Sequence, residues 1–154
     1  MFSGKKILIT GGTGSLGSSL TKRLLRMDVD TIRIFSRDEW KQTQMRSEIN
    51  DKRLRFLIGD IRDKERLTRA TEDVDIVFHT AALKHVPKIE YNPFEAIKTN
   101  VIGSQNVINA CFILSALYQW HFFLSNHHYP HPQKQFTNCS NSHTVGIERR
   151  LQWT

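Results

Sequence analysis

The sequence predicts an α/β fold in which helices cover both faces of a parallel sheet. Two observations lead to this prediction. Short apolar runs alternate with stretches of helical length up to residue 111, and a glycine-rich turn joins the first run to the first helical stretch. The 154 residues are enough for about one domain. A hydrophobic fraction of 39% and a charged fraction of 24% exclude wholesale disorder and a fibrous repeat.

Four strands and the helices between them account for most of the first half of the chain. Strands joined through helices lie parallel, because each right-handed crossover returns the chain to the same end of the sheet. The predicted strands are Lys6–Thr10, Thr31–Phe35, Leu54–Ile58 and Val74–His79, and the predicted helices are Ser15–Met27, Glu39–Ile49 and Asp63–Ala70, with Asp63 as N-cap of the last.

A further helix is predicted to begin at Asn92-Pro93, an N-cap residue followed by proline at the first helical position. Together these elements predict the first part of a doubly wound, Rossmann-type nucleotide-binding sheet that is truncated after about four strands. The apolar residues of this helix fall mostly along one face, namely Phe94, Ile97, Val101, Val107, Ile108 and Cys111.

The strand–helix alternation stops after residue 111. Residues 112–154 hold five of the seven histidines and a single acidic residue, Glu148. We therefore expect a nucleotide-binding domain over 1–111 and an atypical tail over 112–154, aberrant or disordered, of the kind that an out-of-frame end of a truncated gene would give. A diverged but genuine C-terminus is the alternative. With the fourth strand left at a sheet edge, we expect a poorly soluble product.

The turn from Gly11 to Gly17 has the spacing G-x-x-G-x-x-G. Glycine permits a tight turn and lets a diphosphate approach the backbone, while the helix that follows directs its free N–H groups toward the same point. A purely structural turn is the alternative, but the strand before it and the helix after it favour a dinucleotide. The candidate cofactor-binding residues of this turn are Gly11, Thr13, Gly14, Ser15, Leu16 and Gly17.

The end of the second predicted strand indicates which dinucleotide is bound. Folds that prefer NAD usually place an acidic residue there to hold the ribose 2′-hydroxyl. This chain has Ser36-Arg37, with Lys41 one helical turn further on, and these groups would bind a 2′-phosphate through charge-assisted hydrogen bonds. The arrangement favours NADP. Asp38 and Glu39 leave an alternative open, since either carboxylate has the reach to contact the ribose.

Two more strand ends supply candidate contacts. After the third strand, Asp60 would accept a hydrogen bond from the adenine amino group and Ile61 would pack on the ring, although a loop or capping role for Asp60 is the alternative. After the fourth strand, small residues let a cofactor lie against the backbone, and a lysine points toward the cleft. These residues are Thr80, Ala81, Ala82 and Lys84.

His85 invites a general-base interpretation, but its position before Val86-Pro87 in a predicted loop favours a structural role. No metal site is expected, because the histidines near residue 130 have no closely spaced cysteine or acidic partner.

The formal charge of +7 suits a phosphate-bearing partner. Nucleic acid is not expected as a partner, because the chain has no clustered basic helix or aromatic platform. No apolar run is long enough for a signal peptide or a membrane span, and with two cysteines a cytoplasmic protein with free thiols is expected.

At these residues the chain resembles the N-terminal part of the inverting UDP-N-acetylglucosamine 4,6-dehydratases. These are polysaccharide-biosynthesis enzymes of the extended short-chain dehydrogenase/reductase type, acting in capsular-polysaccharide and pseudaminic-acid pathways. The resemblance covers residues 5–111. The motifs that carry it, in chain order, are T-G-G-T-G-S-L-G, F-S-R-D-E-W-K-Q, G-D-I-R-D, H-T-A-A-L-K-H-V-P and E-Y-N-P-F-E-A-I-K-T-N-V-I-G-S-Q-N-V-I-N-A-C.

The resemblance implies a bound NADP, a nucleotide-sugar substrate such as UDP-N-acetylglucosamine, and a homo-oligomer as in related enzymes. It implies a lyase reaction that removes water across C5 and C6 of the sugar and inverts C5. Lys84 matches a position lining the substrate cleft, and Asn100 matches a helix asparagine near the active site.

The family's S-T-D-K stretch and Y-x-x-x-K pair are absent from these 154 residues, so no catalytic residue is assigned and enzymatic activity is left open. A catalytically inactive NADP-binding fragment, or the product of a truncated gene, is the alternative function.

Overall fold

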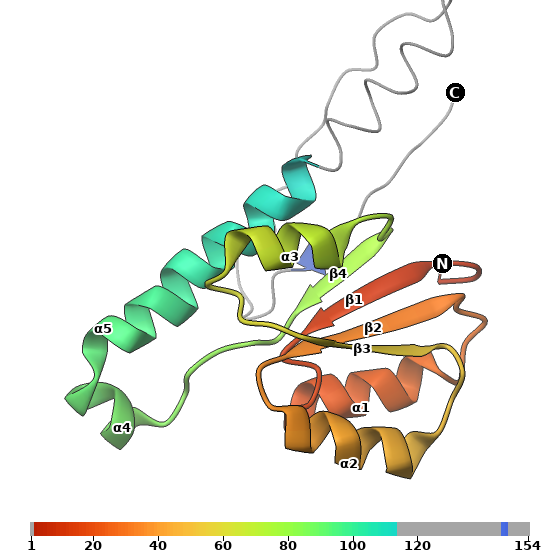
Figure 1. The fold of residues 1–154 in the computed structure, drawn as a ribbon, viewed down its shortest axis with the longest axis horizontal. Coiled ribbons are helices and arrows are strands. Elements are labelled where there is room, and N and C mark those ends of the chain that lie inside the picture. Colours follow the sequence, from red (N-terminus) through yellow and green to blue (C-terminus); the bar gives the residue numbers. More distant parts are fainter. Residues whose placement is uncertain (1, 114–145, 148–154) are drawn as a thin grey trace, which may run out of the picture.

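The computed structural model describes residues 2–113 and 146–147. Within these ranges four parallel strands form a sheet in the order β3-β2-β1-β4 (Figure 1). The chain therefore winds outward from β1 to β3 and then crosses back to place β4 on the other side of β1. The predicted doubly wound sheet is confirmed. The strands are β1 (Lys6–Thr10), β2 (Thr31–Ser36), β3 (Leu54–Ile58) and β4 (Ile76–His79).

The prediction that β4 forms an open edge is wrong at two positions. A short strand, β5 (Gly146–Ile147), pairs antiparallel with β4 through Val77 and Phe78. Residues 114–145 and 148–154, on which the rest of the tail prediction falls, lie outside the described residues.

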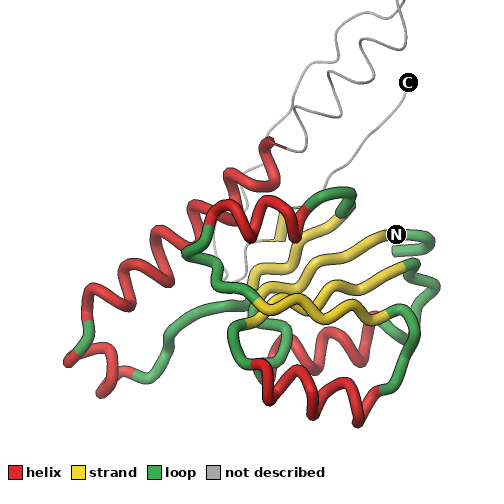
Figure 2. The backbone as a smooth tube through the Cα atoms, in the orientation of Figure 1, coloured by secondary structure: helices red, strands yellow, loops and turns green. Residues whose placement is uncertain are grey.

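Helices lie on both faces of the sheet (Figures 1 and 2). On one face lie α1 (Ser15–Leu24) and α2 (Glu39–Ile49). On the other face lie α3 (Lys64–Thr71) and the helical residues 104–113. Between β4 and residue 104 the chain forms a helical arm, residues 86–103, that consists of α4 (Val86–Tyr91), α5 (Pro93–Ala96) and the π-helix η1 (Ile97–Gly103).

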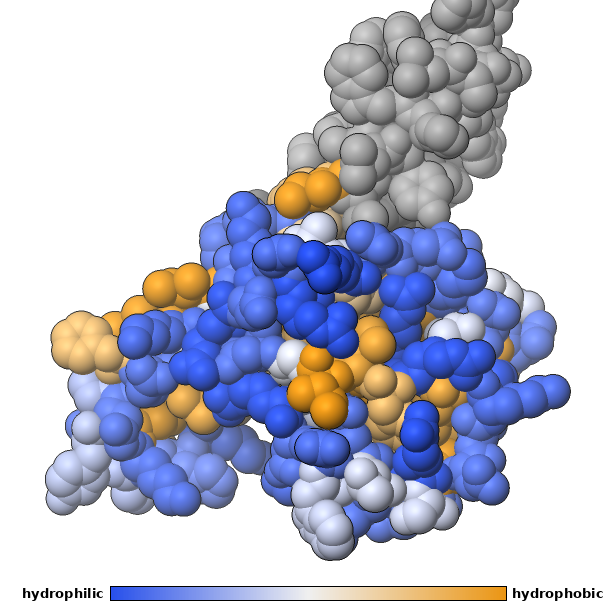
Figure 3. Space-filling view, in the orientation of Figure 1, coloured by the Kyte–Doolittle hydropathy of each residue, from blue (hydrophilic) through white to orange (hydrophobic). Residues whose placement is uncertain are grey.

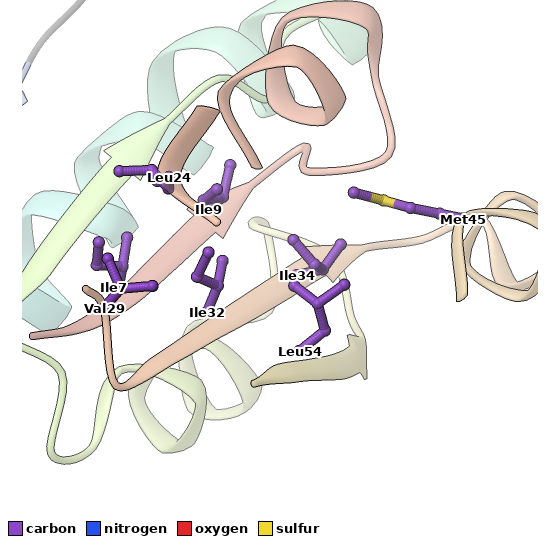
Figure 4. Close-up of a cluster of buried hydrophobic side chains, with 8 residues drawn as sticks. All are labelled: Ile7, Ile9, Leu24, Val29, Ile32, Ile34, Met45 and Leu54. Atoms are coloured by element: carbon purple, nitrogen blue, oxygen red, sulfur yellow. The ribbon is translucent and has the colours of Figure 1, made fainter. Parts of the chain in front are cut away.

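Alternating side chains of β1 supply two separate cores. Ile7 and Ile9 point to the α1–α2 face, whereas Leu8 points to the face covered by α3. All three side chains are fully buried, as expected for a parallel strand covered on both sides. The first core, shown in Figure 4, consists of Ile7, Ile9, Leu24, Val29, Ile32, Ile34, Met45 and Leu54. The second consists of Leu8, Phe35, Ile61, Leu67, Ala70, Val74, Val107 and Ala110.

Helix α1 ends at Leu24 rather than at the predicted Met27. The guanidinium of Arg53, just before β3, donates to the carbonyl oxygens of Leu25 (2.8 Å) and Met27 (3.1 Å). It also pairs with the Asp51 carboxylate, at 2.8 Å. Because Arg53 donates hydrogen bonds to the carbonyl oxygens of Leu25 and Met27, these groups are satisfied without a further turn of α-helix.

The start of α5 also differs from the prediction. Asn92 occupies the N-cap position, but its side chain makes no capping hydrogen bond there. Its amide nitrogen instead donates to the carbonyl oxygen of Lys88 at 3.0 Å, within the preceding helix. The sequence predicts a loop at Val86-Pro87, whereas the structure forms helix α4 there. Proline is nevertheless compatible with this position, since α4 begins one residue before it.

The predicted apolar face of this last helix is buried only at its C-terminal end. Val107 lies in the second core and Cys111 packs against it, whereas Phe94 is 75% exposed and Val101 is 61% exposed. The arm projects beyond the sheet, and Figure 3 shows hydrophobic residues gathered over it. The large apolar side chains exposed on the arm are Val86, Tyr91, Phe94, Ile97, Val101 and Ile102.

Candidate functional site

The predicted contact residues lie together at the end of the sheet where the four parallel strands terminate. Backbone hydrogen bonds join the neighbouring strand ends: the Gly11 N–H donates to Phe35 O (2.8 Å), and the Gly59 N–H donates to Ser36 O (3.1 Å). On the other side of β1, the Thr80 N–H donates to Thr10 O at 3.0 Å. The connection reverses direction between β1 and β4, which is where ligands bind in open α/β sheets.

The glycine turn is packed so closely that two of its positions accept no side chain. Gly11 has φ +68°, and a Cβ placed there would lie 2.7 Å from Ala81 Cα. A Cβ on Gly17 would lie 2.6 Å from Gly12 Cα. The turn is therefore held between the residues after β4 and the first turn of α1, with its backbone at the surface of the site.

The N-terminus of α1 offers uncapped backbone donors. Gly14 occupies the N-cap position, no side chain caps the helix, and no acidic residue lies in its first turn. Ser15 and Leu16 are exposed, Leu16 to 60%, so this leucine lies outside the core-facing side of α1. Free N–H groups and a positive helix end fit a diphosphate.

At the end of β2 the side chain of Arg37 faces solvent, whereas that of Ser36 faces the interior of the protein. Ser36 is nearly buried, and its hydroxyl oxygen accepts from Gln42 Nε2 at 2.9 Å. Gln42 also donates to Leu57 O at 3.0 Å, so it fixes the end of β2 against β3. Arg37 is exposed and pairs with Asp60 at 3.5 Å. Its guanidinium therefore lies between the ends of β2 and β3.

The acidic residues beside Arg37 are already engaged or exposed. Asp38 is the N-cap of α2 and accepts from the Lys41 N–H at 3.0 Å, a hydrogen bond that lowers the pKa of this carboxyl group. The Lys41 ammonium pairs with the same carboxylate at 3.4 Å. Glu39 is exposed in the first turn of α2. Of the two carboxylates that leave the NAD alternative open, Asp38 thus serves as a helix cap.

Asp60 is the centre of a charge network after β3. Burial raises the pKa of its carboxyl group, but hydrogen bonds from Arg62 and the charge of Arg37 outweigh this and hold the pKa below its ordinary value. The Arg62 guanidinium contacts Asp60 at 2.7 Å and Glu95 of α5 at 2.6 Å. The loop after β3 is therefore tied to the helical arm by alternating charges.

Ile61 lies in the second core rather than on an open surface, since it is 4% exposed. Its side chain packs against Gly103, where a Cβ would lie 2.6 Å from Ile61 Cδ1. The Asn106 amide, buried one turn further on, donates to Ile61 O (3.1 Å) and Arg62 O (3.2 Å). Sequence reasoning missed Asn106 and Gln42. Their signal is a polar residue on the inward face of an amphipathic helix, beside Val107 and Met45 respectively.

The segment after β4 lies beside the glycine turn. The Thr80 hydroxyl donates to Thr10 O at 2.7 Å, and Ala81 contacts Gly11 as described above. Ala82 and Lys84 are exposed. The side chain of Asn100 in η1 clamps Leu83, accepting from its N–H (2.8 Å) and donating to its carbonyl oxygen (2.9 Å). Asn100 thus fixes the backbone that presents Lys84.

Two histidines flank this segment. His85 is exposed at the N-cap position of α4, so it does not lie in a plain loop. His79, the last residue of β4, is partly buried, and burial lowers the pKa of its imidazole. Its two ring nitrogens contact the Thr10 hydroxyl at 2.6 Å and the Ser104 hydroxyl at 3.0 Å.

Comparisons with known proteins agree with this arrangement. The sequence profile of a family described as polysaccharide biosynthesis protein matches residues 7–117. The chain is 60% identical over 113 residues to UDP-N-acetylglucosamine 4,6-dehydratase (inverting) from Campylobacter jejuni, a match that covers 73% of this chain and 34% of the relative. The chain therefore spans about a third of the length of the curated relatives it matches.

Solved structures give the same result. The X-ray structure of Pen from Bacillus thuringiensis matches with a TM-score of 0.72 and 47% identity over 74% of this chain and 35% of that one. DesIV, a dTDP-glucose 4,6-dehydratase from Streptomyces venezuelae solved with NAD and TYD bound, matches with a TM-score of 0.65 and 29% identity over 71% of this chain and 36% of that one. In the part of this chain that is described, no helix is long and apolar enough to cross a membrane.

Proposed function

Because the chain belongs to the polysaccharide biosynthesis protein family, we propose that residues 1–111 are the NADP-binding portion of a nucleotide-sugar 4,6-dehydratase. The observation that supports this most directly is the uncapped start of α1 behind a glycine turn that excludes side chains at Gly11 and Gly17. This cradle fits the diphosphate of a dinucleotide.

Three further groups complete the proposed cofactor site. Arg37, with Ser36 and Lys41 nearby, binds a ribose 2′-phosphate and thereby selects NADP over NAD. Asp60 keeps its carboxylate ionised and accepts from the adenine amino group. Thr80 and its two alanine neighbours form the wall opposite the glycine turn. When bound, NADP supplies the acceptor and donor of the hydride that leaves C4 of the sugar and returns to C6.

The proposed substrate is a nucleotide sugar of the UDP-N-acetylglucosamine type. Lys84, held in place through the Asn100–Leu83 clamp, carries a positive charge that orients the anionic nucleotide or the sugar hydroxyls at the mouth of the site. Assembly into a homo-oligomer and a cytoplasmic location stay predictions of the sequence.

Titration of the full chain with NADPH, followed by nucleotide fluorescence, tests the cofactor proposal. Arg37→Ala is expected to weaken NADPH binding about tenfold or more, since a charge-assisted hydrogen bond is lost, and to leave NADH binding unchanged. Arg55→Ala removes an exposed arginine near the start of β3 and serves as the matched control. Equal losses of NADPH and NADH affinity in Arg37→Ala, or no NADPH binding by the folded chain, would refute the cofactor proposal.

A second candidate function is that of an inactive NADP-binding fragment. It is favoured by the absence of S-T-D-K and Y-x-x-x-K from the 154 residues, because a tyrosine needs the neighbouring ammonium to lower its pKa for proton transfer. Incubation with UDP-N-acetylglucosamine and NADP, followed by analysis for a 4-keto sugar nucleotide, separates the two functions. NADPH binding without product supports the fragment, whereas product formation supports the dehydratase.

A further inference from the structure

An unbroken chain of hydrogen bonds runs from the residue before the glycine turn to the loop that carries Lys84. The Thr10 hydroxyl contacts His79 Nδ1 at 2.6 Å, and His79 Nε2 contacts the Ser104 hydroxyl at 3.0 Å. The Ser104 hydroxyl donates to Asn100 O at 2.7 Å. The Asn100 side chain in turn clamps the backbone of Leu83 at 2.8 and 2.9 Å.

The hydrogen bonds around His79 determine which of its ring nitrogens carries the proton. Ser104 has one hydroxyl proton, and that proton is donated to Asn100 O. The Ser104 oxygen can therefore only accept from His79, so Nε2 carries the ring proton. In the neutral ring Nδ1 then has no proton and accepts from the Thr10 hydroxyl. A neutral Nε2–H imidazole satisfies both contacts at once, whereas the other neutral tautomer would place an unprotonated Nε2 against a hydroxyl whose proton is already donated. Burial lowers the pKa of the ring and so disfavours the imidazolium.

The two ends of this series of hydrogen bonds, at Thr10 and at Leu83, belong to the two halves of the site. Thr10 immediately precedes Gly11, and its carbonyl oxygen receives two hydrogen bonds from Thr80. Asn100 lies in η1, whose hydrogen bonding departs from that of the α-helix. In the α-helices, Thr21, Thr43 and Thr68 donate to the carbonyl oxygen four residues earlier, whereas the buried Thr99 hydroxyl of η1 has no partner among the described residues. The Asn100–Leu83 clamp joins η1 to a segment outside the helix.

We propose that His79 is a positioning residue that couples the glycine turn to the Leu83–Lys84 segment, acting through Thr10 on one side and through Ser104 and Asn100 on the other. It touches neither cofactor nor substrate. Its rigid ring sets the spacing between the end of β1 and η1, so that a change at the diphosphate end is transmitted to the backbone presenting Lys84. The assignment of the two ends to cofactor and sugar rests on the proposed function.

The first test needs no ligand. Nitrogen-15 NMR of the full chain should show the His79 ring as the neutral Nε2–H tautomer, and a predominant Nδ1–H tautomer would overturn the proposal. Hydrogen exchange of the Leu83 amide should become about fivefold faster in Thr10→Val and in His79→Phe, the effect of losing about one neutral hydrogen bond. In the His79→Phe background, Thr10→Val should add nothing further.

The controls separate coupling from general loosening. His79→Gln retains one acceptor and one donor and should restore part of the Leu83 protection. Thr31→Val, at the opposite end of the sheet, should leave Leu83 unchanged, and exchange at the Ile34 amide should be the same in all variants. An unchanged Leu83 in both His79→Phe and Thr10→Val, or an equal acceleration at Ile34, would show that His79 only fills space.

A second measurement tests whether NADPH binding acts on Leu83 through the hydrogen bonds of His79. Saturating NADPH should slow Leu83 exchange in the wild type and have no such effect in His79→Phe. If slowing persists in His79→Phe, the coupling does not pass through this ring and the proposal fails. If the wild type binds no NADPH, the proposed function fails, while the tautomer and the ligand-free exchange still decide the role of His79.

Discussion

The β1–β3 part of the molecule and the helical arm both carry large apolar side chains, but the surroundings of these side chains are opposite. Between β1 and β3, side chains such as Ile32 and Ile34 are fully buried between the sheet and its two helices. On the arm, Tyr91 and Phe94 are 88% and 75% exposed. An apolar stripe shows that a helix can be buried on that side, whereas burial itself depends on a partner surface that the stripe does not specify.

The polar contacts of the two regions differ in the same way. In the β1–β3 part, the Arg53 guanidinium donates to the carbonyl oxygens of Leu25 and Met27, more than twenty-five residues earlier in the chain. It also pairs with the Asp51 carboxylate two residues away. On the arm, Glu95 pairs with Lys98 one helical turn away at 3.0 Å and with Arg62 of the loop after β3 at 2.6 Å, and its side chain is 46% exposed. Exposed ion pairs contribute little to stability, because solvent screens them.

The largest expected difference lies between two isoleucines. Ile32→Ala should lower the free energy of unfolding by about 2–5 kcal/mol, since it removes a fully buried side chain from the first core. Ile97→Ala, on the arm, should change it by less than about 0.5 kcal/mol, because Ile97 is already 48% exposed. Urea unfolding followed by circular dichroism measures both values. Equal losses would mean that the arm is as well packed as the sheet.

A smaller difference is expected between two carboxylates in acid. Hydrogen bonds from Arg53 lower the pKa of Asp51 from 3.8 to about 2. Because the pKa in the folded state is the lower one, ionised Asp51 stabilises the fold above the unfolded-state pKa, and this contribution disappears as the pH falls toward about 2. Asp51→Asn should therefore cost about 1–2 kcal/mol near neutral pH and progressively less in acid.

Glu95→Gln is the matched change on the arm. A hydrogen bond from Lys98 and the charge of Arg62 also lower the pKa of Glu95, but this carboxylate is exposed and solvent screens its contacts. We expect its effect on the unfolding free energy between about pH 6 and pH 3 to be clearly smaller than that of Asp51→Asn. Identical pH profiles for the two variants would contradict the contrast between the regions.

The smallest difference is expected between two N-cap positions. Asp63 accepts from the Arg66 N–H at 2.9 Å and caps α3. Asp63→Ala should cost about 1 kcal/mol. Asn92 makes no capping bond to α5, so Asn92→Ala should cost only a few tenths, from the exposed bond to Lys88. Thermal unfolding of both variants beside the wild type resolves the pair, and a larger loss in Asn92→Ala would reverse the interpretation.

Local sequence patterns predict well where neighbouring residues decide the structure. The bounds of β1, α2 and β3 agree with the prediction, because each is set by its own apolar run or by a nearby cap such as Asp38. The end of α1 was predicted three residues too late, since it depends on Arg53, which follows it by almost thirty residues. No propensity rule includes such a contact.

The same distinction applies to the candidate site. Its location follows from the sequence, because Gly11, Ser36, Asp60 and Thr80 lie at or just after the ends of parallel strands and must therefore meet at the same end of the sheet. The supporting contacts do not follow from it. Asn106 reaches the loop after β3, and Ser104 reaches His79, only because the last helix crosses that face of the sheet with a π-helical segment.

That π-helical segment has a consequence for the contacts that this region makes. Seven residues wound more loosely than an α-helix shift the angular phase of everything that follows them. Asn100 can consequently meet Leu83 while Asn106, on the same rod, meets Ile61 and Arg62. If these seven residues tightened to α-helical winding at unchanged length, the distal half of the rod would rotate, and Asn100 and Asn106 could no longer both make their contacts. The two contacts therefore depend on the looser winding of residues 97–103.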